Sequence, residues 1–125
     1  MNIVDSTLWL EFYAGTEAGS NISSVIENSD ELLVPTIIIY EVFKKLLFEV
    51  NEDDALYVIA HMRQGKVIEL TEELSLYAAK ISKDYKLPMA DSIIYATNMK
   101  HNCLLWTQDK HFYGLNSVNY FEKMK

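Results

Sequence analysis

Short apolar runs alternate along this chain with segments in which apolar residues recur at helical spacing. The apolar runs predict strands at residues 2–4, 32–34, 66–70 and 103–106, and an edge strand at residues 117–121. Helical spacing predicts helices over residues 8–13, 21–28, 36–50, 53–62 and 89–100, and a further helix that opens at Thr71. Strands that alternate with helices in this way are typical of βα units and a parallel sheet.

The segment that follows Pro35 allows two interpretations. Its run Ile37-Ile38-Ile39 is β-branched, so residues 33–40 could form one strand. The apolar positions further along the segment recur at helical spacing, which favours a helix capped by Thr36. With that helix, the pattern predicts an α/β fold: a three-layer α/β/α sandwich around a central, mostly parallel sheet of four or five strands.

Length and composition fit a single domain over residues 1–125, with 50% hydrophobic residues to form its core. The single cysteine, Cys103, excludes a disulfide framework and a cysteine-based zinc cluster, and the three histidines lack zinc-site spacing. We expect a cytoplasmic protein, because the cysteine usage suits a reducing compartment and the N-terminus lacks the basic start of a signal peptide. No apolar run is long enough to span a bilayer, so no membrane contact is expected.

The net charge of −7 argues against a protein that holds nucleic acid by its overall charge, because backbone affinity comes mainly from Lys and Arg. The positions of individual acids are more informative than the net charge. Asp5 directly follows the first strand, and Asp109 lies just beyond the strand at residues 103–106. Glu41 and Asp91 lie in the first turns of two predicted helices. Ligands of parallel sheets bind beyond the carboxyl ends of the strands, so these four acids are candidates for one site.

Each acid also has a structural explanation. Asp5 and Asp109 could cap helices, Asp91 could favour a helix dipole, and Glu41 could pair with a lysine three or four residues later. Two observations favour function. Glu41 and Asp91 lie in apolar segments, and neither segment supplies an arginine to neutralise them. A buried carboxylate without a partner is costly.

A divalent cation would resolve the repulsion among four crowded carboxylates. Oxygen ligands without His or Cys suit Mg²⁺ or Mn²⁺. Such ions hold a phosphodiester, lower the pKa of a bound water and stabilise the leaving oxygen. The pattern therefore predicts Asp5, Glu41, Asp91 and Asp109 as metal ligands and catalytic residues, with Mg²⁺ or Mn²⁺ as cofactor.

These residues carry a resemblance to the PIN-domain family, and within it to the VapC toxins of toxin–antitoxin pairs. Ile-Val-Asp-Ser-Thr-Leu-Trp-Leu-Glu resembles the first motif of the family, and Pro-Thr-Ile-Ile-Ile-Tyr-Glu-Val resembles the second. Leu-Pro-Met-Ala-Asp-Ser-Ile-Ile-Tyr-Ala-Thr resembles the third, and Leu-Leu-Trp-Thr-Gln-Asp-Lys-His-Phe the fourth. The motifs occur in order and span nearly the whole chain.

The resemblance implies a metal-dependent endoribonuclease that hydrolyses RNA with a metal-activated water. It also implies a small antitoxin partner, contact with operator DNA only through that antitoxin, and a homodimer. Ser6 and Thr107 would support the metal ligands through their hydroxyls. One departure is His111, which stands where many relatives have a further acid, and this would weaken a second metal site. An exposed turn residue and a phosphate contact are the alternatives for His111.

Other functions fit less well. A receiver domain needs paired acids after the first strand, and a haloacid-dehalogenase-like phosphatase needs Asp-x-Asp there, whereas this chain has Asp5-Ser6-Thr7. A catalytically weak or inactive PIN-fold module that binds RNA or a protein partner remains the main alternative. Trp9, Phe12 and Tyr13 could stack on RNA bases, although core or dimer contacts are the commoner use of such aromatic residues.

Overall fold

A parallel sheet of five strands forms the centre of this computed structural model, which describes residues 1–123. The strands are β1 (Asn2–Val4), β2 (Leu32–Pro35), β3 (Lys66–Ile68), β4 (Leu104–Thr107) and β5 (Val118–Tyr120). Their order across the sheet is β3-β2-β1-β4-β5, and every neighbouring pair is parallel. The predicted parallel sheet is confirmed, and it has five strands, the larger of the two numbers that were predicted.

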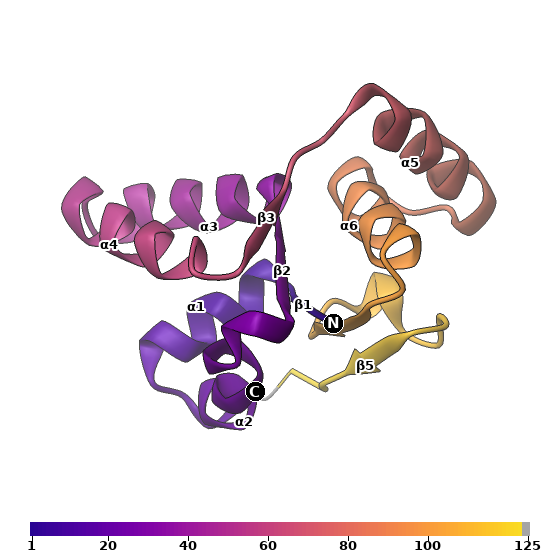
Figure 1. Ribbon diagram of the computed structural model, residues 1–125. Coiled ribbons are helices and arrows are strands. Elements are labelled where there is room, and N and C mark those ends of the chain that lie inside the picture. The colour runs from indigo at the N-terminus through magenta and orange to yellow at the C-terminus, as the bar shows by residue number, and fades with distance from the viewer. Residues whose placement is uncertain (124–125) are drawn as a thin grey trace.

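Among the described residues, six α-helices cover the two faces of the sheet. They are α1 (Ser6–Ala14), α2 (Glu17–Glu27), α3 (Thr36–Glu49), α4 (Glu52–Met62), α5 (Glu72–Tyr85) and α6 (Met89–Lys100). Helices α1 to α4 lie on one side of the strands, with α3 and α4 as an antiparallel pair, and α5 and α6 lie on the other (Figure 1). Two single 3₁₀ turns, η1 (Ser29–Glu31) and η2 (Lys110–Phe112), precede β2 and follow β4. The three-layer α/β/α prediction is confirmed.

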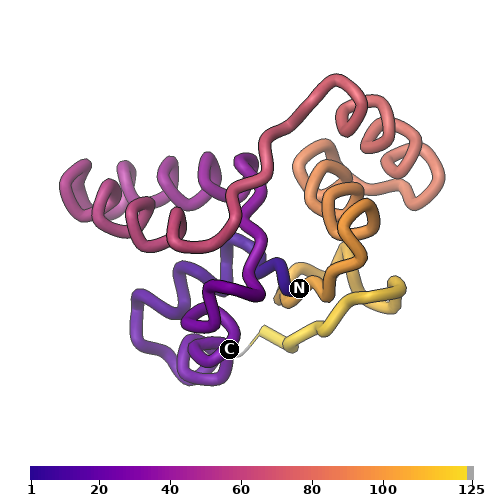
Figure 2. Tube along the Cα trace, viewed as in Figure 1, coloured from indigo at the N-terminus to yellow at the C-terminus, as the bar shows by residue number. Residues whose placement is uncertain are grey.

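The direction of the chain reverses across the sheet at β1. The chain passes from β1 outward to β2 and β3, then crosses through α5 and α6 to β4 on the other side of β1, as the Cα trace shows (Figure 2). Connections that leave neighbouring strands in opposite directions open a crevice at their carboxyl ends. The crevice expected here lies between the ends of β1 and β4, where Asp5 and Asp109 follow the strands.

The central strands are buried because helices cover both of their faces. All four residues of β2 are buried, and Ile3, Val4 and Leu105 of the adjacent strands are at most 1% exposed. Near-continuous apolar strands are typical of parallel sheets, whereas an alternating pattern is typical of a sheet with one wet face. This explains why the short apolar runs were a reliable signal.

The segment after Pro35 is helical, so the strand interpretation of residues 33–40 is wrong. Ile38 is fully buried and Val42 and Leu46 follow it on the same face of α3, so tertiary packing outweighs the β propensity of the isoleucines. The chain then breaks before α4, where the Asn51 side chain caps the new helix by accepting from the Asp54 amide at 2.8 Å.

Helix α2 begins earlier than predicted and packs closely on α1. Thr16 caps it by accepting a hydrogen bond from the Gly19 amide at 3.1 Å. A Cβ atom on Gly19 would lie 2.2 Å from the backbone oxygen of Glu11, so only glycine permits this approach of the two helices. The α1–α2 pair is therefore tightly packed, and the N-terminus of α1 lies at the end of β1.

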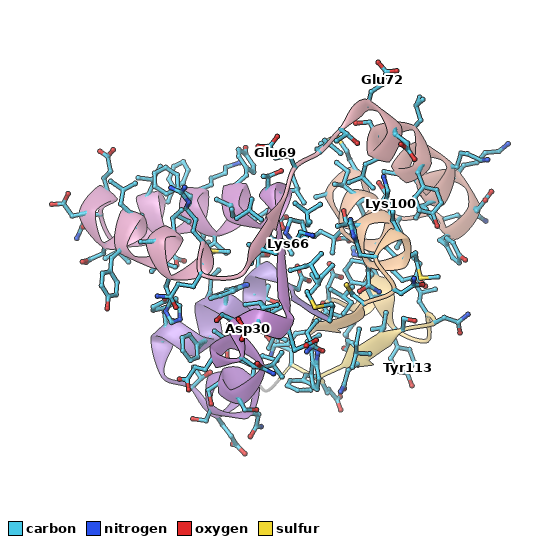
Figure 3. The ribbon with its side chains drawn as sticks, in the orientation of Figure 1. Asp30, Lys66, Glu69, Glu72, Lys100 and Tyr113 are labelled. Atoms are coloured by element: carbon cyan, nitrogen blue, oxygen red, sulfur yellow. The ribbon has the colours of Figure 1, made fainter. Side chains whose placement is uncertain are left out.

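Charged side chains project outward around the connection between β3 and α5, as Glu69 and Glu72 do (Figure 3). Lys100, on α6, pairs with Glu73 of α5 across a distance of 3.6 Å. Within residues 1–123, no helix combines the length and the apolar character that crossing a bilayer requires.

Candidate metal centre

Asp5 lies at the carboxyl end of the central strand and is 4% exposed. Its amide donates to the Trp106 carbonyl of β4 at 2.9 Å, which fixes its backbone between the two strands. One carboxylate oxygen accepts from the Ser6 amide at 2.8 Å, and the other accepts from the Thr107 hydroxyl at 2.7 Å. Asp5 is therefore a helix cap, as its structural explanation predicted, and its carboxylate is also held in one orientation at the crevice.

Asp109 is placed by the same threonine. The Thr107 hydroxyl accepts from the Asp109 amide at 3.0 Å while it donates to Asp5, so one side chain connects both acids. Asp109 in turn caps the turn η2, because its carboxylate accepts from the His111 amide at 2.9 Å. The Thr107 side chain thus contacts both acids, and its support of a metal centre stays a prediction.

Asp91 comes from the N-terminus of α6 and lies near Asp109. It is 8% exposed and lies in the first turn of a helix that starts after Pro88. Its carboxylate lies 3.0 Å from the Nδ1 atom of His111, and the same nitrogen lies 2.8 Å from the Asp109 carboxylate. Asp91 and Asp109, which come from different elements, thus share one neighbour.

Glu41 comes from the second turn of α3. Its Oε1 atom is buried and has no hydrogen-bond partner among the described residues. Burial raises the pKa of this carboxyl first, and the charges of Asp5 and Asp109 raise it further, while the Ser6 side chain offsets part of the rise. The charges of the two acids at the ends of β1 and β4 therefore act on Glu41 as well.

The carboxylates oppose one another's ionisation. Burial, followed by the charge of Asp109, raises the pKa of Asp91 from 3.8 to about 7, although His111 acts in the opposite direction. Burial also raises the pKa of Asp5, and the hydrogen bonds from Thr107 and Ser6 lower it again. Such shifts mark groups that are held together at a cost to the folded state, which is common at functional sites.

The four predicted acids thus come from four parts of the chain and meet at one edge of the sheet. The family comparison fits this arrangement, because the sequence profile of the PIN domain matches residues 3–117. The chain belongs to the PIN domain family. The matched segment includes every one of the four acids as well as Ser6, Thr107 and His111.

Solved structures share the fold of this PIN domain at low sequence identity. A toxin–antitoxin complex from Klebsiella pneumoniae is 20% identical, with a TM-score of 0.80 over 95% of this chain and 96% of that one. VapBC2 from Rickettsia felis, bound to a DNA fragment from its promoter, is 9% identical, with a TM-score of 0.75 over 97% and 98% of the two chains. VapC20 from Mycobacterium tuberculosis, a toxin that cleaves the sarcin-ricin loop, is 12% identical, with a TM-score of 0.71 over 98% and 90%. A comparison with curated protein sequences finds no match.

The donor set of this PIN domain fits a divalent cation. Asp91, Asp109 and His111 each offer a ligand atom, and these atoms lie within 4.8 Å of one another. The unpartnered Glu41 oxygen is a buried acceptor that a cation would satisfy. Carboxylate oxygens predominate, as hard cations require.

His111 is the residue whose contacts the sequence did not predict. Its side chain is 57% exposed, as a turn residue would be, yet its ring nitrogen lies against two of the acids. In the sequence, only its position two residues after Asp109 indicated that His111 lies near the acids. Ser6 contributes its backbone amide to Asp5. Among the described residues, none of the four predicted ligands forms an ion pair with a lysine or an arginine that would explain its burial.

The aromatic residues near the N-terminus form part of the interior. Trp9 is 1% exposed, and Phe12 and Tyr13 pack against the core at its margin. Their rings make edge contacts with His61 of α4. The core interpretation of Trp9 is therefore the right one.

Lys45 is paired with Glu49 at 3.1 Å, as a residue of a solvated helix face commonly is.

Proposed function

We propose that this PIN domain is a divalent-cation-dependent endoribonuclease and the toxin of a type II toxin–antitoxin pair. The observation that carries the proposal is the convergence of four acids at the carboxyl ends of β1 and β4, with a buried Glu41 oxygen that has no partner among the described residues. Mutual repulsion in such a cluster is a cost that a bound cation removes. The acids are therefore better explained by a ligand than by the fold.

In this proposal Asp5, Glu41, Asp91 and Asp109 hold Mg²⁺ or Mn²⁺. When bound, such a cation supplies an activated water, charge stabilisation at the phosphate and support for the leaving oxygen. The residues of the chain position it: Thr107 holds the Asp5 carboxylate by a 2.7 Å hydrogen bond, and Ser6 holds its other oxygen through the backbone. The buried setting of Asp5 and Asp91 excludes water from the acids and strengthens their pull on a cation.

We propose RNA as the substrate, with a route to the phosphate that does not depend on a basic surface. A net charge of −7 leaves little basic surface to hold a nucleic acid, so contact with the scissile phosphate has to come through the cation. A neighbour in structure, VapC20, is a toxin that cleaves the sarcin-ricin loop, and this supports RNA over DNA. We place the activity in the cytoplasm, where RNA targets are abundant.

An antitoxin partner and a homodimer are further parts of the proposal. Several neighbours in structure are toxin–antitoxin complexes, and some of them hold DNA, which supports operator binding through the antitoxin. Tyr40 and Phe48 of α3 are 58% and 82% exposed and line one surface hollow, so we propose this face as a protein contact. A separate cavity of about 630 Å³, lined by α1 and the α3–α4 pair, is a second place where part of a partner fits in this proposal.

The deciding experiment is cleavage of a structured RNA by the purified protein with Mg²⁺ or Mn²⁺, compared with EDTA and with the Asp91→Asn variant. We expect cutting that requires both the metal and Asp91. Asp84→Asn is the matched control, because Asp84 is an exposed acid on α5 away from the crevice. Cutting by Asp91→Asn at the rate of the natural protein would reject the assignment, and no cutting with any metal would favour a binding module.

The toxin role has its own test. Expression of the chain without a partner should arrest growth, and expression of Asp5→Asn should not. Harmless expression of the natural chain would count against the toxin role while leaving the nuclease proposal intact.

A further inference from the structure

His111 is the one nitrogen donor in a cluster of oxygen donors. Its Nδ1 atom lies 2.8 Å from an oxygen of Asp109 and 3.0 Å from an oxygen of Asp91. We propose that His111 is a direct ligand of the cation at this centre and that its imidazole makes the site prefer Mn²⁺ and similar transition metals to Mg²⁺. This inference rests on the metal centre of the proposed function and adds the identity of the metal to it.

The backbone around His111 holds its side chain at the acids. The amide of His111 donates to Asp109 at 2.9 Å, so the turn η2 is fastened to the acid that it follows. The next residue, Phe112, is fully buried and packs near Tyr95 of α6. His111 is thus fixed between a bonded acid and a buried ring, and it does not depend on a flexible loop to reach the cluster.

The three donor atoms are close enough to serve one ion. One atom from each of Asp91, Asp109 and His111 lies within 4.8 Å of the other two. The nitrogen that faces the carboxylates is already within hydrogen-bond distance of both, so the side chains need only small adjustments to share a cation. A neutral imidazole offers the lone pair that this role requires.

The nature of the donor atom then determines which cation binds best. Mg²⁺ prefers oxygen ligands and retains its waters. Imidazole nitrogen binds the divalent transition metals more strongly than Mg²⁺, and its affinity rises from Mn²⁺, the weakest of them, through Co²⁺ to Ni²⁺. In a site built only of carboxylates, the size and the availability of each ion would decide which cation binds. An imidazole in the same ligand set shifts that choice toward the transition metals.

A different role for His111 makes the opposite prediction. A protonated His111 could act as a fixed counter-ion for Asp91 and Asp109, and a metal would then have to displace it. Removal of such a counter-ion should tighten the binding of Mn²⁺ and Mg²⁺ alike. Removal of a ligand should weaken Mn²⁺ binding and leave Mg²⁺ binding much less affected. The two roles therefore differ in the sign of the effect.

The first experiment is calorimetric titration of the RNA-free protein with Mn²⁺ and, separately, with Mg²⁺. We expect His111→Ala to weaken Mn²⁺ binding roughly tenfold or more, and Mg²⁺ binding by less. His111→Asp, which restores an all-carboxylate set, should shift the preference toward Mg²⁺. The control is His101→Ala, because His101 follows the far end of α6, about 15 Å along the helix from Asp91. An unchanged ratio of the two affinities in His111→Ala, or tighter binding of both ions, would overturn the proposal.

Pulsed electron paramagnetic resonance of the Mn²⁺-loaded protein supplies a direct second measurement. The spectrum should show a nitrogen coupling from imidazole that disappears in His111→Ala and remains in His101→Ala. Absence of that coupling in the natural protein would also overturn the proposal. Nitrogen-ligated Mn²⁺ without any RNA cleavage would reject the nuclease and keep this inference, whereas metal-dependent cleavage without the coupling would do the reverse.

Discussion

Two clusters of side chains lie at the two ends of α1. Their polar groups repel one another in the first cluster and are favourably paired in the second. At the start of α1, Asp5 joins Glu41, Asp91 and Asp109 in a set of like charges, which we call the acid cluster. At its other end, Tyr13 joins Trp9, Phe12 and His61 in an aromatic cluster. A histidine Nδ1 atom contacts oxygen at each cluster. His111 lies against the carboxylates of Asp91 and Asp109, and His61 contacts the Tyr13 hydroxyl at 2.5 Å.

The difference separates stability from function. In the aromatic cluster the rings meet edge to face and the hydroxyl has a partner, so the contacts stabilise the packing of α1 on α4. In the acid cluster, burial and mutual repulsion raise the carboxyl pKa values, so holding the acids together in ionised form lowers the stability of the fold. Substitutions in the aromatic cluster should therefore reduce stability, and substitutions in the acid cluster should reduce activity.

The largest effect is expected for Trp9→Ala in the aromatic cluster. Trp9 is 1% exposed, and loss of such a ring costs about 3–5 kcal/mol of unfolding free energy. Urea denaturation measures this loss. The exposed Leu76, changed to Ala, is the control and should have little effect. A stability of Trp9→Ala close to that of the natural chain would mean that the aromatic cluster does not support the fold.

The next effect is expected for Asp5→Asn in the acid cluster. Asparagine still caps α1 but loses the charge, so we expect RNA cleavage to fall about a hundredfold or more while the fold is retained. Cleavage rates and circular dichroism measure the two properties. If Asp5→Asn unfolds the protein instead, the distinction between the two clusters fails at its most buried acid.

The acid cluster also predicts how stability depends on pH. In the folded, metal-free protein the Asp91 pKa is about 7, against 3.8 for the ordinary group. Between these values the folded state keeps a proton that the unfolded state has lost, so the contribution of Asp91 to stability falls as pH rises from about 4 to about 7. Asp91→Asn lacks this dependence.

We therefore expect the melting temperature of Asp91→Asn in EDTA to rise relative to that of the natural protein, by a few degrees, across this pH range. Thermal melts at several pH values measure the difference. A constant difference at every pH would show that Asp91 does not carry the repulsion. Addition of Mn²⁺ should favour the natural protein, because the cation binds the ionised carboxylate.

The sequence predicted the fold more fully than it predicted the contacts of the site. Apolar strands and amphipathic helices follow from local periodicity, and only boundaries moved, as at the earlier start of α2. The four acids could be proposed from their places beside strand ends and in apolar segments. Their metal-binding roles remain predictions. The contact of His111 with two acids depends on α6 meeting the turn after β4, which no local pattern encodes.

The smallest effect is expected for Tyr13→Phe, which removes one hydrogen bond from the aromatic cluster and keeps the ring. The Tyr13 hydroxyl contacts His61 Nδ1, so its loss should cost about 1 kcal/mol of unfolding free energy. Cleavage of RNA should stay unchanged, because the acid cluster lies at the other end of α1. Tyr57→Phe, at a position 73% exposed on α4, is the matched control and should leave both properties unaltered. A loss of cleavage in Tyr13→Phe without a loss of stability would link the two clusters through α1 and break the separation between them.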